Sequence, residues 1–407
     1  MIHNLLDAFF KNYSLTDNNN NHSLSLPKLL HLLRSSCCFG QPALVEFDMQ
    51  FRTCLSQLLN ISLDDQQWAQ ASLPVGDGGL GIRSATQLAP SAYLASASGS
   101  ADLVTRILAH SSTVVNDPRI RDAERDWLTL GGVSLPTGDN RKSQRSWDRG
   151  PIEATKVGLL AAAVDDYDKA RLLAVFAPHA GDWLNAAPIT AVGLRLSNDV
   201  IRVAAGLRLG SNLCAPHNCA CCQPVDARGS HGLSCMRSAG RSLRHLLVND
   251  IIYRELIRAD VAAVKEPSGL IVGSALRPDG ATLIPWARGK CLAWDATIVD
   301  TVASSHLSLT RNQAGAAASH AADLKQQKYA GIASSHFIIP VSLETFGAWH
   351  TASLDFIREL GRRASQVTGD LRETAFLLQR LSVAVQRGNA ASVRGSLPSN
   401  RIVSDDS

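Results

Sequence analysis

The stretch LRPDGATLIPWARGKCLAWDATIVDT, residues 276–301, carries most of what the chain reveals about its fold. Two apolar runs are joined by a short basic segment at 287–289, which predicts an antiparallel hairpin. The middle of such a run usually holds apolar residues. Yet Asp279 opens the first run and Asp295 lies inside the second. The hairpin therefore carries two carboxylates that packing alone does not explain.

The turn predicts how the two acids lie relative to each other. If Trp286 faces Lys290 across a turn at 287–289, then Ala281 lies opposite Asp295. Because side chains alternate between the faces of a strand, Asp279 and Asp295 then share one face as diagonal neighbours. We expect that face to be an open, solvated cleft. The other face of the second strand would supply the core residues Leu292, Trp294, Ala296 and Ile298.

Two carboxylates held this close favour a bound cation. They repel each other unless a proton or a cation lies between them, and oxygen ligands of this kind suit Mg²⁺ or Mn²⁺. A metal there could activate water and stabilise negative charge at phosphorus. Lys325 and Lys328 share one face of the next predicted helix, and either could supply a further cation. The alternative is that Asp279 belongs only to a Pro-Asp-Gly turn and Asp295 is a tolerated strand residue.

Residues 214–235, CAPHNCACCQPVDARGSHGLSC, hold five of the nine cysteines. The spacing C-x2-C-x8-H-x3-C predicts one tetrahedral site, because two close thiolates and a His–Cys pair can bind the same ion. Three sulfurs and one nitrogen suit Zn²⁺ better than Mg²⁺. The predicted ligands are Cys219, Cys222, His231 and Cys235. Three further residues remain open as substitutes: Cys214, His217 and Cys221.

A basic stripe follows this cluster. Arg237, Arg241 and Arg244 fall at i, i+4 and i+7, with His245 beside them. Such a stripe can follow a phosphate backbone, although an ordinary solvated helix face would have the same pattern. Residues 1–235 hold 20 Lys and Arg against 21 Asp and Glu, whereas residues 236–407 hold 20 against 15. The basic excess therefore lies in the C-terminal part, which suits a polyanionic partner.

The pattern along the chain predicts a mixed α+β protein. Helical periodicity prevails before the cysteine cluster, and helices alternate with strands after it. No apolar run is long enough to span a membrane, and the start lacks the layout of a signal peptide. We therefore expect a soluble intracellular protein. The predicted segments are a disordered tail at 1–23, helices at 24–130, a helical linker at 131–210 with a polar loop at 134–155, a zinc knuckle at 211–236, an α/β module at 237–395 and a disordered tail at 396–407.

The order of these segments resembles the C-terminal part of the polyprotein of non-LTR retrotransposons of the restriction-like-endonuclease class. The resemblance rests on Arg277-Pro278-Asp279, on the later acid Asp295, and on the knuckle that precedes both. VDARGSHGLSC, RHLLVNDIIYREL, KEPSGL and QRGNAASV also read like that family. SLPKLLHLLRSS and QASLPVGDGGLGIRSA are similar to the helical thumb and linker that follow its reverse transcriptase. The resemblance covers residues 24–395.

The resemblance implies a PD-(D/E)xK nuclease fold, a small mixed sheet flanked by helices, with Asp279 and Asp295 as metal ligands. Many nucleases of this fold have a lysine two residues after the second acid, whereas the resembled family shows a relocated lysine. Thr297 stands there, so Lys325 or Lys328 would have to supply the cation. Glu266 would be an additional acid from the preceding helix.

The resemblance also sets expectations about function. It implies a protein that nicks DNA, contacts element RNA as a possible second partner, and acts in the nucleus, or is cytoplasmic if the copy is decayed. No Tyr-x-Asp-Asp-type motif is present, so we expect no reverse transcriptase activity. The alternative is a non-catalytic remnant that binds nucleic acid through the zinc knuckle and the basic helix.

Overall fold

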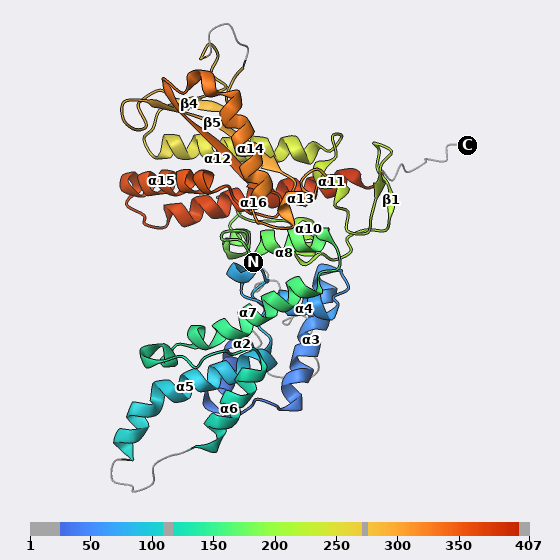
Figure 1. Ribbon diagram of the computed structural model, residues 1–407, viewed down its shortest axis with the longest axis vertical. Coiled ribbons are helices and arrows are strands. Elements are labelled where there is room, and N and C mark those ends of the chain that lie inside the picture. The colour runs from blue at the N-terminus through green and yellow to red at the C-terminus, as the bar shows by residue number, and fades with distance from the viewer. Residues whose placement is uncertain (1–24, 109–116, 271–275, 399–407) are drawn as a thin grey trace, which may run out of the picture. The chain divides into compact units, whose positions relative to one another are not determined.

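The computed structural model describes residues 25–108, 117–270 and 276–398 (Figure 1). It divides the chain into two compact units, residues 2–162 and 163–407. The boundary between the units falls inside the predicted linker at 131–210. The predicted tail at 1–23 and most of the tail at 396–407 lie outside the described residues. Among the residues described, no helix combines the length and hydrophobicity needed to cross a bilayer.

The unit of residues 2–162 is helical over its described part. Its elements are α2 (Ser25–Ser35), α3 (Pro42–Leu59), α4 (Asp65–Ala71), η2 (Val75–Asp77), α5 (Ala85–Ile107), α6 (Pro118–Thr129), η3 (Gly138–Lys142) and α7 (Gln144–Ala162). Side-chain caps fix several of the starts. The Asp64 carboxylate accepts the Gln67 N–H at the start of α4, and the Gln67 side chain accepts the Asp64 N–H in return. The Ser84 hydroxyl caps α5. Such caps satisfy N–H groups that the first helical turn leaves unpaired.

The predicted loop at 134–155 is wrong over its second half, because α7 begins at Gln144. Trp147 is fully buried and meets Trp127 edge to face, with ring centroids 5.2 Å apart. The Trp127 indole N–H also donates to the Trp147 carbonyl at 2.7 Å. Burial of this aromatic pair outweighs the polar, Gly- and Pro-containing composition on which the loop prediction depended.

The unit of residues 163–407 is mixed α+β. Its helices are α8 (Asp166–Phe176), α9 (Asp182–Asn185), α10 (Asn198–Leu209), α11 (His231–Ser234), α12 (Ala239–Arg258), α13 (Leu307–Thr310), α14 (Ala316–Lys328), η4 (Ala330–Ile332), α15 (Thr351–Thr368) and α16 (Glu373–Ser396). Its strands are β1 (His217–Asn218), β2 (Pro224–Val225), β3 (Ala263–Lys265), β4 (Gly280–Thr282), β5 (Cys291–Val299) and β6 (His336–Glu344). Helix α16 includes Ser396, so the tail predicted to start at residue 396 starts one residue too early.

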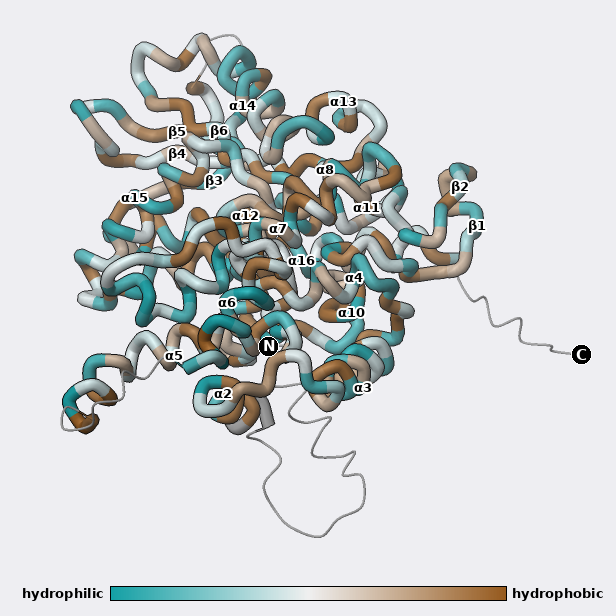
Figure 2. The backbone as a smooth tube through the Cα atoms, turned by 60° about the horizontal axis from the view of Figure 1, so that its bottom comes forward, coloured by the Kyte–Doolittle hydropathy of each residue, from teal (hydrophilic) through white to brown (hydrophobic). Residues whose placement is uncertain are grey.

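A four-stranded mixed sheet forms the centre of this unit. The strand order is β3-β4-β5-β6, with β5 antiparallel to β4 and parallel to β6. Figure 2 shows largely hydrophobic residues along β5 and β6. One face of β5 packs into a core that α12, α15 and α16 also supply, as predicted for Leu292, Trp294, Ala296 and Ile298. The other face lies under α14 and η4, where Ala293 packs with Tyr329 and Ile332.

The predicted hairpin register is wrong by two residues. Ala281 lies opposite Ala293 rather than Asp295. The turn closes between Ala287 and Lys290, and both residues of 288–289 have positive φ, as a two-residue hairpin turn requires. The chain between Thr282 and that turn leaves the ladder, and the Thr282 hydroxyl takes the place of a backbone group by accepting the Leu292 N–H. Extending the observed register by one residue places Asp279 directly opposite Asp295.

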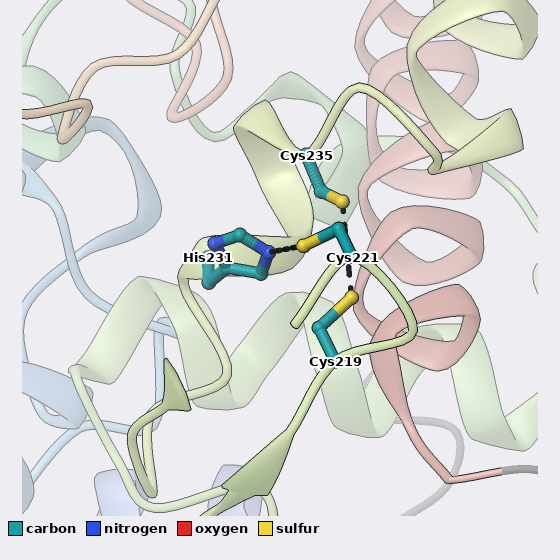
Figure 3. A group of neighbouring side chains, drawn as sticks. All are labelled: Cys219, Cys221, His231 and Cys235. Atoms are coloured by element: carbon teal, nitrogen blue, oxygen red, sulfur yellow. Dashed lines mark hydrogen bonds between the residues drawn. The ribbon is translucent and has the colours of Figure 1, made fainter. Parts of the chain in front are cut away.

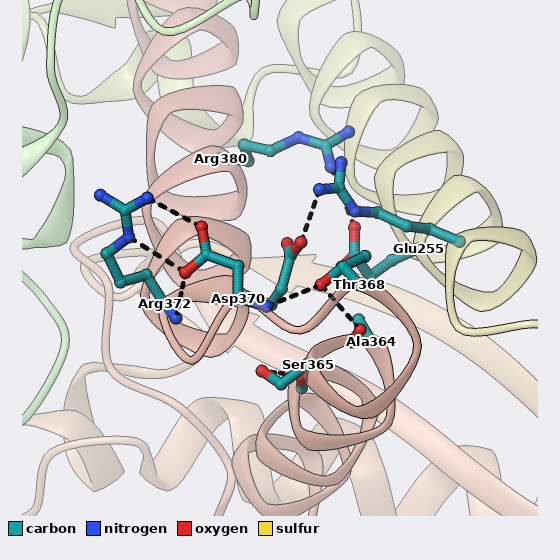
Figure 4. Close-up of polar contacts among 10 residues, drawn as sticks. Glu255, Ala364, Ser365, Thr368, Asp370, Arg372 and Arg380 are labelled. Atoms are coloured by element: carbon teal, nitrogen blue, oxygen red, sulfur yellow. Dashed lines mark hydrogen bonds and ion pairs between the residues drawn. The ribbon is translucent and has the colours of Figure 1, made fainter.

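Charged groups are also buried in this unit, next to the α15–α16 turn (Figure 4). Glu255 on α12 is fully buried and accepts a hydrogen bond from Arg380 at 3.1 Å. Burial raises the pKa of Glu255, and the positive charge of Arg380 opposes that effect. A nearby pair, Asp370 with Arg372, is exposed at the surface. The two pairs provide a matched comparison of buried and exposed charges.

We expect Arg380→Met to destabilise the protein by about 3 kcal/mol, because it leaves the buried Glu255 carboxylate without this partner. Arg372→Met should have a far smaller effect, since its ion pair is in water. The measurement is the urea midpoint of each variant. Because burial raises the pKa of Glu255, the folded Arg380 variant holds a proton more tightly than the unfolded chain. Its deficit should therefore shrink as pH falls through that raised pKa, and equal deficits in both variants would contradict the prediction.

Candidate functional site

Asp295 lies on the face of β5 that α14 covers, and it is 3% exposed. Its Oδ1 accepts a hydrogen bond from Lys325 Nζ at 2.5 Å. Its Oδ2 accepts one from the Tyr329 hydroxyl at 2.5 Å, and Lys328 Nζ is 3.9 Å from the same oxygen. The expectation of an open cleft at Asp295 is therefore wrong. Helix α14 closes over the carboxylate; Lys325 within the helix and Tyr329 directly after it donate to the two oxygens.

The Asp279 carboxylate contacts Ala296, the residue that follows Asp295 on β5. Its Oδ2 accepts the backbone N–H of Ala296 at 2.7 Å and lies 2.8 Å from His245 Nε2. Its backbone carbonyl accepts the Glu266 N–H at 2.9 Å. The structure thus brings Asp279 and Asp295 to opposite positions at the two inner strands of the sheet, with a lysine on the second acid and a histidine on the first.

The side chains around the two acids differ from the predicted set. The hydrogen bond to the Asp279 carboxylate raises the pKa of His245 above its usual range. Burial, followed by the hydrogen bond to Asp295, raises the pKa of Tyr329, so its hydroxyl stays protonated and donates. Sequence reasoning missed Tyr329. Its spacing of four residues after Lys325 on a predicted helix was the signal that places both side chains on one face.

Glu266 does not belong to this group. It is exposed, follows the strand β3 rather than a helix, and has positive φ. It contacts the site through its backbone N–H, which donates to the Asp279 carbonyl. The prediction that a helix would present this acid is wrong, because α12 ends at Arg258 and a strand intervenes.

The arginines of the predicted basic stripe differ in burial: Arg244 is buried, whereas Arg237 and Arg241 are exposed. Arg244 is 1% exposed and donates to Asn389, to Ser392 and to the Leu233 carbonyl. It therefore joins α11 to α16 and cannot contact nucleic acid, which corrects the prediction. Arg237 precedes α12 and donates to the Ala220 carbonyl at 2.6 Å.

A second cluster lies on the small hairpin β1–β2 and on α11 (Figure 3). The ligand atoms of Cys219, Cys221, His231 and Cys235 all lie within 4.8 Å of one another and could hold a metal ion. Cys221 Sγ is 3.1 Å from His231 Nε2, and Cys219 Sγ is 3.8 Å from Cys235 Sγ. Four ligands about 2.3 Å from one Zn²⁺ in a tetrahedron would have sulfurs about 3.8 Å apart. The observed separation of the two sulfurs fits that geometry.

The predicted ligand Cys222 is replaced by its neighbour Cys221. Cys222 is exposed, has φ of 68°, and donates its N–H to the Cys219 carbonyl at 2.8 Å. This tight turn directs the last residue outward and the preceding one inward. The N–H of Gln223 lowers the pKa of the Cys221 thiol to about 7, whereas burial raises the pKa of Cys219.

The other two alternative ligands, Cys214 and His217, contact backbone carbonyl groups outside the cluster. Cys214 Sγ contacts the Asp226 carbonyl, and His217 Nε2 lies 2.8 Å from the Ser396 carbonyl. The cluster is tied to the rest of the unit by Arg228, which bonds Asp165 and Asp168 and lies 4.4 Å over the Tyr167 ring.

Comparison with known proteins yields no family. No protein-family model matches the chain, and no curated protein matches it either. The function of this protein must therefore be inferred from the geometry of its own residues.

Proposed function

We propose that residues 237–395 form a metal-dependent endonuclease of the PD-(D/E)xK type that nicks DNA. One observation carries the proposal: Asp279, directly before β4, lies opposite Asp295 on β5, and Lys325 contacts the second acid. The four-stranded mixed sheet with helices on both faces is consistent with the fold that the sequence resemblance implies. On the same grounds we propose that the chain derives from a non-LTR retrotransposon polyprotein, with DNA as its partner, element RNA as a second one, and the nucleus as its place of action.

The residues divide the work of hydrolysis as follows. Asp279 and Asp295 would hold Mg²⁺ or Mn²⁺, whose chemistry there is activation of water and neutralisation of charge at phosphorus. His245 and the Ala296 N–H orient Asp279 through Oδ2, which leaves Oδ1 for another partner. Tyr329 holds Asp295 from the covered side. The Lys325 ammonium can stabilise negative charge that develops on a phosphate beside it.

The cysteine cluster has a structural role in this proposal. Three thiolates and an imidazole are the ligands that Zn²⁺ prefers, and all four positions would be filled by protein. A closed site of this kind stabilises a fold instead of activating a substrate. The next residues, 236–238, lead directly into α12, which carries His245.

The test of the nuclease is relaxation of supercoiled plasmid by the purified chain. Open circles should form with Mg²⁺ or Mn²⁺ and not in metal-free buffer. A variant lacking both Asp279 and Asp295 side chains, purified in parallel, sets the background from contaminating nucleases. No nicking above that background in either metal would refute the enzyme.

A second candidate function is binding of nucleic acid without catalysis. The observation that favours it is the pairing of Asp295, whose two oxygens already accept Lys325 and Tyr329. A carboxylate satisfied in this way is stable without a metal. The plasmid assay separates the two functions: a non-catalytic protein would shift the plasmid in a gel without nicking it.

Distance predicts which lysine serves the site. Lys325 Nζ is 2.5 Å from Asp295, whereas Lys328 Nζ is 3.9 Å away and lies 4.7 Å over the Tyr329 ring. We expect Lys325→Ala to slow nicking by about 100-fold, since an electrostatic contact of this kind is worth that much at a reacting phosphate. Lys328→Ala should stay within about threefold of the unchanged protein. The measurement is the initial nicking rate, and the reverse order would assign the role to Lys328.

A further inference from the structure

An open cleft of about 620 Å³ lies directly beside the two acids. Its floor is the segment 296–298 of β5, which continues past the point where β4 stops pairing. One wall is the start of α12, with Arg241 and His245, and Lys325 of α14 also lines it. The cleft thus borders the carboxylate site, because His245 and Lys325 line the cleft and also contact Asp279 and Asp295.

The lining combines positive charge with exposed apolar side chains. The ionisable side chains that line this cleft are Arg241, His245 and Lys325. His245 contacts Asp279 and Lys325 contacts Asp295, whereas Arg241 forms no ion pair among the described residues and is open to an anion. Met236 is 90% exposed and Leu246 is 65% exposed. Covering these two side chains with an apolar surface would contribute about 25 cal/mol for each Å² of apolar area removed from water.

This combination distinguishes between forms of nucleic acid. A duplex presents phosphates outward and keeps its base faces stacked inside, so it offers Met236 and Leu246 little to cover. An unpaired strand offers a phosphate and a base face within one nucleotide. A thioether also makes favourable contacts with aromatic rings. The lining therefore matches an unpaired strand.

We propose that this cleft binds an unpaired nucleic-acid strand, with its phosphate at Arg241 and Lys325 and a base against Leu246 and Met236. The inference deepens the proposed nuclease, on which it rests for its substrate class. It places an unpaired strand beside Asp279 and Asp295 and makes unpaired or locally opened DNA the preferred substrate. Because Met236 directly follows the cluster residue Cys235, the knuckle lies at the Met236 end of the cleft.

The test is binding without catalysis, by fluorescence anisotropy in Mg²⁺-free buffer. The probes are a labelled 12-nucleotide DNA of mixed sequence, its RNA counterpart, and the DNA duplex. We expect the DNA strand or the RNA strand to bind at least tenfold more tightly than the duplex at equal salt, and the two arms show which sugar is preferred. Duplex binding as tight as that of both strands would overturn the inference.

Variants locate the contact. Leu246→Ser should weaken strand binding by about fivefold, and Arg241→Gln should weaken it and reduce the salt dependence by about one phosphate contact. The matched controls are Leu371→Ser, at a residue 91% exposed on the α15–α16 turn, and Arg254→Gln, at an exposed arginine further along α12. The controls should bind as the unchanged protein does. Equal binding by Leu246→Ser and its control would reject the cleft.

The two proposals fail separately. If the protein binds single strands but does not nick plasmid, the nuclease proposal is refuted and the cleft proposal stands. If the protein nicks plasmid but binds duplex more tightly than single strands, the nuclease proposal stands and the cleft proposal is refuted.

Discussion

Asp295→Asn is expected to lower plasmid nicking by about 1,000-fold or more while leaving the chain folded. The change keeps the shape of the side chain but removes the negative charge, so the position no longer attracts a divalent cation. It also leaves the Lys325 ammonium without its closest carboxylate. Losing one member of a catalytic group that acts as a unit usually removes most of the rate. The measurement is the initial rate of open-circle formation in Mg²⁺.

The matched control is Asp323→Asn, which removes an exposed carboxylate from the same helix α14. Its nicking rate should be unchanged. Circular dichroism and a thermal melt establish that Asp295→Asn is folded. Should that variant unfold, Asp279→Asn gives the same test at a less buried side chain, 15% exposed against 5%. Retention of activity within tenfold in a folded variant would remove Asp295 from the mechanism.

The second strand of the hairpin and the basic helix could be predicted because local pattern and burial agree there, whereas β3 was missed. Residues 291–299 alternate so that Leu292 and Trp294 enter the core, and the structure confirms that face. The basic helix expected after the cysteine cluster is also present, as α12. Apolar periodicity determines these elements because each buries one continuous face.

The register of the hairpin could not be predicted from periodicity. A two-residue shift keeps every side chain on its face, so alternation is satisfied by both registers. The structure selects one through a local feature, the Thr282 hydroxyl that accepts the Leu292 N–H. Asp279 therefore faces Asp295 directly instead of diagonally, although the shared face was predicted correctly.

The sequence pattern also could not predict which of the three arginines would be buried. Arg237, Arg241 and Arg244 have one spacing, yet Arg241 is exposed and Arg244 is buried. The difference comes from α16, whose Asn389 and Ser392 lie about 150 residues later and accept from Arg244. Helical spacing specifies which residues share a face but not what that face will contact. The same limit applies to Asp295, because no local pattern shows that α14 covers it.

The ligands of the cysteine cluster permit a sharp test of sequence spacing against geometry. The C-x2-C spacing selected Cys222, whereas the structure directs Cys221 toward His231 and leaves Cys222 exposed. We expect Cys221→Ser to lose most bound zinc, because a hydroxyl replaces one of three thiolates and structural zinc sites depend on all four ligands. Cys222→Ser, one residue away, should keep one zinc per chain.

The measurement is zinc released on unfolding, together with the visible spectrum of the Co²⁺-loaded protein. The cobalt spectrum reports thiolate ligands directly, so Cys222→Ser should reproduce the unchanged protein and Cys221→Ser should lose sulfur-to-metal intensity. The metal contributes folding free energy in sites of this kind. Cys221→Ser should therefore melt earlier, and chelator should lower the melting temperature of the unchanged protein and of Cys222→Ser alike. Zinc retained by Cys221→Ser and lost by Cys222→Ser would restore the ligand set that spacing predicts. The turn at 219–222 would then have to reverse its direction when the ion binds.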